Sequence, residues 1–313
     1  MKQTIGWMLL CGLMAAGCAS PPEPRPQDPP QLDPMLAQWS ANAQDAFEKG
    51  MYSRAASLYR MTVDRATMAD NSMEVGKAAL NLAVCEGLLG NTEEARQVLR
   101  RAERAFVRAG HPVADVLILD AKFARELGLA GEAEARLNRA ERETLTRDQS
   151  AQAYLLRAHI ACDRGQPAQA EAFLDRARGR MGDRARPALA ADAEELTARI
   201  LEMTGRYAAA AEAYERQAMW FRQAGLFRDM AEALARAGEG WVAAGEPGVA
   251  TDRFYRAARS LMAQGEHLGA MRVIEKAVQF QEEPVADEDL VKEIAELFEE
   301  IRASVEISRR AGP

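Results

Sequence analysis

The sequence has 313 residues, which is enough for two ordinary domains or one long repeat array. Its composition is 48% hydrophobic but only 6% aromatic, and it has no long alternating β-branched runs between turn signals, so closely packed helices are expected and strands are not. The formal net charge of −7 predicts no strongly basic face, which argues against nucleic acid as a partner.

Residues 1–17 have the features of a secretory signal. Lys2 precedes an apolar run at residues 5–14 that is too short to span a bilayer. Residues 15–18, Ala-Ala-Gly-Cys, resemble the cleavage box of bacterial lipoproteins, although alanine stands where leucine is usual. The resemblance implies cleavage before Cys18, lipidation of Cys18 and, because Ala19 follows it, delivery to the outer membrane. The alternative is an ordinary secretory signal in which Cys18 is incidental.

Residues 18–34 are predicted to be a lipidated cysteine followed by a proline-rich linker. Seven of the chain's 13 prolines lie in residues 19–34. Proline fixes φ and removes the N–H donor, so an extended spacer is expected here instead of a helix or a strand. Sixteen residues at about 3.1 Å each reach about 50 Å, which would hold the folded part away from a membrane surface.

From residue 35 onward one motif recurs: a turn glycine, an alanine five residues later and a large residue four beyond that. The six alanines are 40, 38, 37, 40 and 40 residues apart, which is typical of a repeat array. Small residues also stand seven positions before each glycine. The six motifs are Gly50-Ala55-Tyr59, Gly90-Ala95-Leu99, Gly128-Ala133-Leu137, Gly165-Ala170-Leu174, Gly205-Ala210-Tyr214 and Gly245-Ala250-Phe254.

Each glycine separates two helical patterns and permits the second to fold back on the first. Thr92 is expected to cap the second helix of its pair, and Pro167 and Pro247 lie just inside helix starts, where a missing N–H is harmless. In chain order, the predicted helix pairs are Met35–Met68, Met73–Ala109, Val113–Thr144, Asp148–Arg180, Pro187–Ala224 and Arg228–Gln264.

Two further helices are predicted at the C-terminal end. Residues 265–281 repeat part of the pattern, which extends the array over residues 35–281 as six to seven units. Pro284 ends it, and Asp287 is expected to cap a last helix within residues 282–313, a segment with ten acidic and four basic side chains. We interpret this helix as a solvated terminal cap; an acidic helix that binds a partner is the alternative. Its apolar stripe is Leu290, Ile294, Leu297, Ile301 and Val305.

The pattern of small, glycine, small and large residues resembles the tetratricopeptide repeat, with a period nearer 40 than that family's about 34. The resemblance implies an all-α solenoid, a right-handed superhelix of antiparallel helix pairs whose first helices line a concave groove. The family's groove positions lie three and six residues before each turn glycine. Here they are Gln44, Phe47, Val84, Gly87, Lys122, Arg125, His159, Cys162, Arg199, Glu202, Glu239 and Val242.

Motifs that carry chemistry are missing from the sequence. It contains no H-E-x-x-H, P-loop or G-x-S-x-G pattern, and no Cys/His pair has metal-ligand spacing. We therefore expect no enzyme activity, no cofactor and no metal, and a structural or weak binding role for His159. Cys85 and Cys162 lie two repeats apart, beyond the reach of a disulfide, and are expected to be buried free thiols. Trp220, off the packed stripe of its helix, is either an exposed anchor for a ligand or part of the core.

Together these features predict a lipid-anchored scaffold that faces the periplasm from the outer membrane and binds protein partners through its groove. By resemblance it is similar to lipoproteins that help assemble outer-membrane β-barrels or type IV pilus secretins. One alternative is a solute- or glycan-binding lipoprotein, which would favour clustered groove aromatics where only Phe47 is obvious. The others are a regulator of a peptidoglycan enzyme and a repeat protein without an anchor.

Overall fold

The computed structural model describes residues 33–182, 186–281 and 288–311. The predicted lipidation site Cys18, the predicted cap Asp287 and nearly all of residues 1–34 lie outside these ranges. Within them every regular element is a helix: α1 (Pro34–Glu48), α2 (Tyr52–Met68), α3 (Ser72–Leu88), α4 (Thr92–Arg108), α5 (Ala114–Glu126), α6 (Ala130–Ala140), α7 (Arg147–Asp163), α8 (Pro167–Met181), α9 (Pro187–Met203), α10 (Tyr207–Gln223), α11 (Phe227–Ala243), α12 (Pro247–Ala263), α13 (His267–Gln279) and α14 (Glu288–Ala311).

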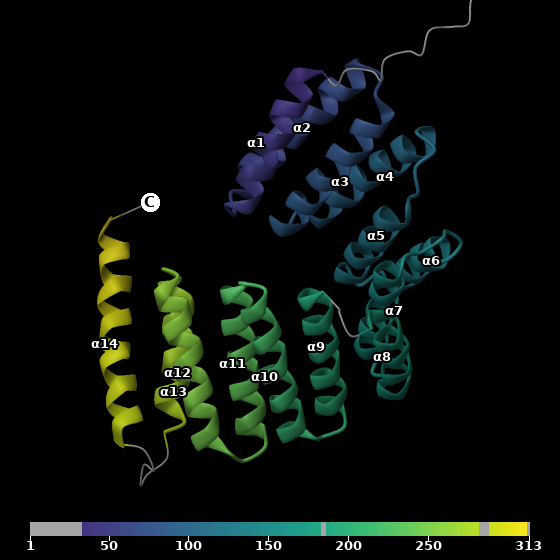
Figure 1. Ribbon diagram of the computed structural model, residues 1–313. Coiled ribbons are helices and arrows are strands. Elements are labelled where there is room, and N and C mark those ends of the chain that lie inside the picture. Colours follow the sequence, from purple (N-terminus) through teal and green to yellow (C-terminus); the bar gives the residue numbers. More distant parts are fainter. Residues whose placement is uncertain (1–32, 183–185, 282–287, 312–313) are drawn as a thin grey trace, which may run out of the picture.

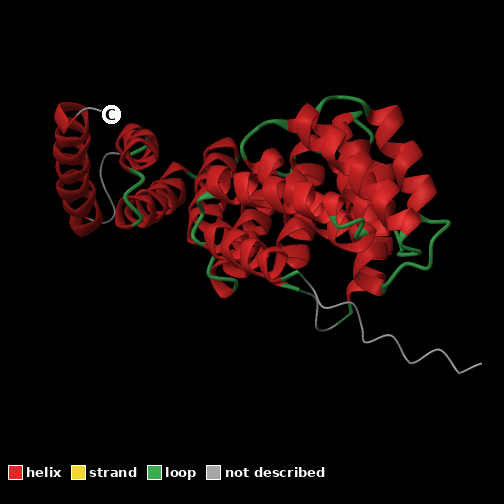
Figure 2. Cartoon of the chain, turned by 90° about the horizontal axis from the view of Figure 1, so that it is seen from above, coloured by secondary structure: helices red, strands yellow, loops and turns green. Residues whose placement is uncertain are grey.

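The helices stack in chain order along a curved array (Figure 1). Helices α1 to α12 form six consecutive pairs, and each helix packs against the next one in the chain. The first helices of the third, fourth and fifth pairs, α5, α7 and α9, also contact one another in sequence. Seen from above, α14 lies at one end of the stack, next to the marked C-terminus (Figure 2). The six predicted helix pairs are confirmed.

The turns follow the sequence motif closely. The six motif glycines have φ between 70° and 82°, a left-handed conformation that costs glycine little and ends each first helix. Pro167 and Pro247 each begin a helix, as predicted. The prediction for Thr92 is wrong: Thr92 is the first residue of α4, and the position before it belongs to Asn91. The Asn91 side chain makes no cap because its amide donates back to Glu86 Oε2 at 2.9 Å.

Helix α1 begins one residue before the predicted boundary, and Asp33 explains why. Its carboxylate accepts a hydrogen bond from the backbone N–H of Met35 at 3.0 Å, which caps the helix, and Pro34 takes the first helical position. The same carboxylate accepts from Arg65 Nε on α2 at 2.7 Å. The first described residue is therefore bonded to both helices of the first pair.

The motif residues form the core of the array. All six alanines of the motif are 0% exposed, and none of the six large residues exceeds 4%. In the sixth pair the small residue before the turn is Gly238 instead of alanine. A Cβ at that position would lie 2.6 Å from Cε1 of Phe254, so the glycine makes room for the ring.

A buried ionic cluster joins the second and third pairs. Arg96 on α4 and Asp120 on α5 are 4% and 2% exposed, and Arg96 Nε donates to Asp120 Oδ1 at 2.7 Å. The other oxygen of Asp120 lies 2.7 Å from Arg136 Nε, and Arg96 also donates to Glu132 on α6 at 2.7 Å. Each buried charge has a partner, as buried charges require.

The C-terminal helix packs as predicted. Ile294 and Ile301 are 0% exposed against α12 and α13, whereas the acidic side of α14 is exposed. Cys85 and Cys162 are both buried free thiols, and burial raises the pKa of Cys85 to about 11. Among the described helices, none combines the length and apolar character that a bilayer span requires.

Candidate functional site: a hollow on the inner face

A hollow of about 680 Å³ opens on α3, α5, α7 and α9, the first helices of four consecutive pairs. These four helices follow the bend that the array makes between α3 and α9 (Figure 1), and we call the cavity the groove hollow. Seven of its lining residues are apolar and eight are polar. The apolar residues are Leu80, Val84, Ile118, Leu119, Leu156, Ala188 and Leu189; the polar ones are Asn81, Asp115, Lys122, Arg125, Gln152, His159, Asp192 and Glu195.

Four of the sequence-predicted groove residues meet here: Val84 on α3 and three polar or charged residues. Lys122 and Arg125 on α5 and His159 on α7 all line the groove hollow. Their register explains this: residues six before the turn glycine of consecutive pairs lie side by side, because each pair repeats the previous one with a small displacement. Lys122 is exposed and forms no ion pair with a described residue, whereas the other two are engaged.

Both ring nitrogens of His159 are occupied. The side chain is buried, with Nε2 2.6 Å from Asp192 Oδ1 and Nδ1 2.9 Å from Nη1 of Arg199 on α9. Because a guanidinium can only donate, Nδ1 accepts, and Nε2 carries the hydrogen that is donated to Asp192. Both nitrogens of the imidazole are therefore engaged by neighbouring side chains.

The network continues through Asp163 at the end of α7. Arg199 Nη2 donates to Asp163 Oδ1 at 2.7 Å, and Arg125 Nε donates to Oδ2 at 2.6 Å. Burial alone would raise the pKa of Asp163, but the hydrogen bonds from the two arginines outweigh it and hold the pKa below its ordinary value. Five side chains on α5, α7 and α9 thus tie three consecutive first helices together. Arg125, His159 and Asp192 among them line the groove hollow, and we call this network the groove wall.

No protein-family model and no curated relative matches the sequence. Solved structures do match. The type IV pilus biogenesis factor PilW has a TM-score of 0.52 at 17% identity, over 74% of this chain and 94% of that one. A signal-transduction ATPase with a tetratricopeptide-repeat sensor from Pyrococcus horikoshii scores 0.51 at 15% identity, over 82% and 41%. The APC/C hetero-tetramer Cut9–Hcn1 scores 0.51 at 10% identity, over 85% and 52%.

The fold is a tetratricopeptide-repeat-like α-solenoid. The six helix pairs, the small and large positions at each turn, and the likeness to these repeat structures agree on this point. The fold class predicted from the sequence is therefore confirmed.

The solenoid places the remaining predicted groove residues outside the groove hollow. Gln44 accepts from the Tyr59 hydroxyl at 3.1 Å, and the ring of Phe47 packs 5.5 Å from that of Tyr52. Glu239 pairs with Lys276 on the following first helix. These residues occupy the same rows as Lys122 and His159 but in other pairs, and their part in binding stays a prediction.

Glu202 and Trp220 lie further along the array. Burial raises the pKa of Glu202, whose carboxylate accepts from the Tyr214 hydroxyl at 3.2 Å. Trp220 on α10 is half-buried, so the structure makes it neither fully exposed nor part of the fully buried core. Both interpretations of Trp220 stay open.

Sequence reasoning missed Asp163 and Asp192, which complete the groove wall. Neither lies three or six residues before a turn glycine. Asp163 could have been recognised from its sequence separation of about one repeat from two basic residues: it lies 38 residues after Arg125 and 36 before Arg199. In the part of the chain that the structure describes, no group of three or more His, Cys, Asp or Glu side chains could hold a metal ion.

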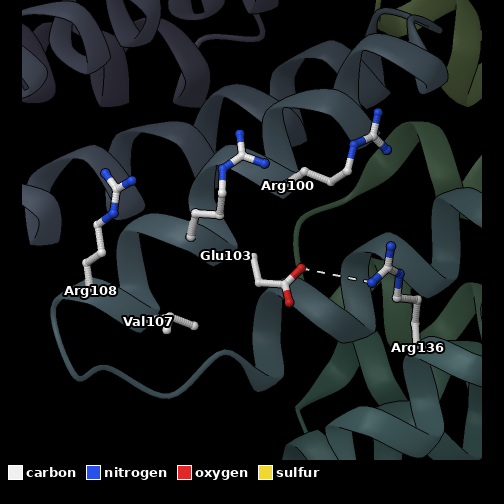
Figure 3. Close-up of a pocket in the computed structure, with 6 residues that line it drawn as sticks. Arg100, Glu103, Val107, Arg108 and Arg136 are labelled. Atoms are coloured by element: carbon white, nitrogen blue, oxygen red, sulfur yellow. Dashed lines mark ion pairs between the residues drawn. The ribbon is translucent and has the colours of Figure 1, made fainter.

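The structure also shows a local cluster of basic side chains that the net charge does not reveal. A second hollow of about 440 Å³, here called the outer hollow, is lined by residues of the second helices α4 and α6 (Figure 3). Four arginines and one acidic residue line it, together with a valine. They are Arg100, Glu103, Arg104, Val107, Arg108 and Arg136. The net charge of the chain gave no sign of this local cluster, because the acidic C-terminal segment dominates the total.

Proposed function

We propose that this solenoid is a protein-binding scaffold that takes an apolar segment of a partner, a helix or an extended peptide, into the groove hollow. The observation that carries the proposal is the composition of that hollow. Its apolar lining from four helices can bury one face of a partner segment, and the unpaired Lys122 can receive a carboxylate beside it. The hydrogen-bonded wall through Asp163 keeps the surface in one conformation, which lowers the entropic cost of binding.

The solved neighbours support the same class of function. The Cut9–Hcn1 structure is a hetero-tetramer, and PilW is a type IV pilus biogenesis factor. We infer from this, and from the sequence at residues 15–18, that the chain is lipidated at Cys18, anchored in the outer membrane and directed into the periplasm. Palmitate labelling tests the anchor: the label should disappear in Cys18→Ser, and a label that survives contradicts it.

We also infer that the chain is not an enzyme and needs no cofactor. His159 is the one histidine in the groove hollow, and both of its nitrogens are already bonded. Burial raises the pKa of the Cys162 thiol, which disfavours the reactive thiolate. A glycan-binding function fits the groove hollow less well, since none of its lining residues is Phe, Tyr or Trp.

Site-specific photo-crosslinking in cells tests the scaffold function. A photoreactive residue at position 122 should capture a partner protein in a defined ratio, because Lys122 lines the groove hollow. The matched control is position 77, where Lys77 is also exposed on a first helix but lies outside the hollow and pairs with Glu74. Equal capture from both positions would contradict a specific groove, and a retained sugar in place of a protein would favour a solute-binding lipoprotein.

A further inference from the structure

The outer hollow contains a row of arginines that form no close ion pair with a described residue. Arg100, Arg104 and Arg108 follow one another at four-residue spacing along α4, about one helical turn apart. All three are exposed, and none forms an ion pair or a side-chain hydrogen bond with a described residue. In Figure 3 the side chains of Arg100 and Arg108 project to the same side of α4. Three exposed guanidinium groups therefore line up over about 12 Å, and Glu132 attracts Arg100 electrostatically without a close ion pair.

The other residues of the outer hollow do not neutralise this row. Glu103, the one acidic residue in the lining, pairs with Arg136 and Arg139 of α6. Val107, 63% exposed, adds an apolar side chain beside the arginines. The three arginines repel one another, and a row of carboxylates on a partner helix would relieve this repulsion while the partner also contacts Val107.

The chain itself carries such a row on α14. Asp289, Glu293, Glu296 and Glu300 are spaced by four, three and four residues, so they follow one face of the helix, turn by turn. All four are exposed, and one of them, Glu293, also hydrogen-bonds the side chain of Tyr255 on α12. The one basic residue that pairs with this row is Lys292, 3.9 Å from Glu296 with both side chains largely in solvent, which is a weak interaction.

The two rows cannot meet within one molecule. Helix α14 packs on α13 and α12, whereas α4 packs on α3 and α5. The two rows belong to separate parts of the curved array (Figure 1). A contact between them must therefore join two copies of the chain.

We propose that the outer hollow binds the acidic row of α14 from a second copy of this chain. With the helices antiparallel, the spacing of about one turn matches in both rows, so Arg108, Arg104 and Arg100 meet Asp289, Glu293 and Glu296 in order. The positive row lies in the C-terminal half of α4 and the negative row in the N-terminal half of α14, which is the arrangement that helix dipoles favour.

This contact has two consequences for assembly. It joins different surfaces of the two copies, so each copy keeps one free arginine row or one free acidic row and can bind the next copy in a chain or a ring. The second helices α4 and α6 lie outside the groove hollow, which stays open. Self-association is thus independent of the proposed partner binding.

Sedimentation velocity of the full chain at about 25 mM and about 500 mM salt tests this proposal. The wild-type protein should associate with rising concentration at low salt and become monomeric at high salt, because exposed ion pairs are screened. Arg100→Glu with Arg108→Glu, and separately Asp289→Arg with Glu296→Arg, should each weaken association at least about tenfold.

The four-fold charge exchange is the decisive variant. Carrying both pairs of substitutions, the chain should regain association to within about threefold of wild type, and the two double variants should associate when mixed, since opposite charges again face each other. Arg164→Glu with Arg206→Glu is the matched control, because both arginines are exposed at turns away from the outer hollow, and it should associate as the wild type does.

Three results would overturn the proposal. The first is a wild-type protein that stays monomeric at low salt. The second is a charge exchange that does not restore association. The third uses vesicles that contain phosphatidylglycerol: if wild type binds them without self-association, and Arg100→Glu with Arg108→Glu does not bind, the outer hollow belongs to a membrane surface instead of a second copy. Circular dichroism of each variant checks that the exposed substitutions leave the fold intact.

Discussion

Substituting Gly238 by alanine tests whether the sixth helix pair is as tightly packed as the structure indicates. The added Cβ would lie 2.6, 2.8 and 2.9 Å from Cε1, Cδ1 and Cζ of Phe254. Carbon atoms in contact lie about 3.5–4.0 Å apart, so three ring atoms would each overlap by about 1 Å. Phe254 is 0% exposed and packs against the ring of Phe280 at 6.1 Å, so its ring has little room to move away.

Two opposing effects set the size of the change. Forcing a methyl group into a packed core costs about 1–3 kcal/mol, whereas alanine in place of glycine in a helix gains about 0.5–1 kcal/mol. Gly238→Ala should therefore lower the free energy of unfolding by roughly 0.5–2 kcal/mol. Gly179→Ala on α8 is the matched control: it is exposed, nothing lies within 4 Å of its added Cβ, and it should be stabilising.

Hydrogen exchange of peptides from α11 and α12 is the appropriate assay, because repeat arrays open locally and a single global transition can average the effect. The same peptides should be measured in Phe254→Leu, where the smaller side chain leaves room for the methyl group. There Gly238→Ala should turn neutral or stabilising, which gives a coupling of about 1–3 kcal/mol. If Gly238→Ala stabilises the wild-type protein, or if Phe254→Leu does not reverse its effect, the packing argument fails.

Further predictions concern the buried and half-buried polar groups. Asp120→Ala should lower the free energy of unfolding by about 3–5 kcal/mol in urea titrations, because Arg96 loses its buried partner; a loss below about 1 kcal/mol would contradict the role of the cluster. The pKa of Glu202 is raised in the fold, so stability should fall as pH rises from the unfolded-state pKa through the folded one, and Glu202→Gln should lack this slope in pH-dependent thermal unfolding. For Asp163 the effect of pH on stability is reversed, because its pKa is lowered in the fold. Its contribution to folding stability is present above the ordinary pKa of aspartate and is lost as pH falls through the lowered folded pKa. Asp163→Asn should therefore flatten the acid side of the same pH profile of thermal unfolding. For Trp220→Ala, lost stability with unchanged partner capture would place Trp220 in the core, and the reverse would make it a binding residue.

The regular part of the fold could be predicted because its physical cause repeats. Every pair needs a glycine at the turn and small residues where the helices cross. Ala55 and the five equivalent alanines therefore recur at a regular spacing that can be recognised in the sequence. The hydrogen bond from the Asn91 side chain to Glu86 could not be predicted. It depends on side-chain geometry that the repeat period does not contain.

The residues of the candidate site could be predicted where they occupy fixed positions relative to the turn glycines. Lys122, Arg125 and His159 were found because they stand three or six residues before a turn glycine, and the solenoid brings those positions to one face. Asp192 was not found, because it enters the network from another position on the following first helix. The arginine row of the outer hollow was hidden for a different reason: a sum over all charges cannot show where charges of one sign gather.

The double attachment of Asp33 has a mechanical consequence. If the N-terminal segment tethers the protein to a surface, any pull on the folded part arrives at this residue. Its carboxylate accepts hydrogen bonds from the Met35 N–H at the start of α1 and from Arg65 on α2. The force is therefore divided between two antiparallel helices instead of unwinding α1 from its end. The first pair should then yield as a unit under load, and Arg65→Ala should lower the force at which it does so.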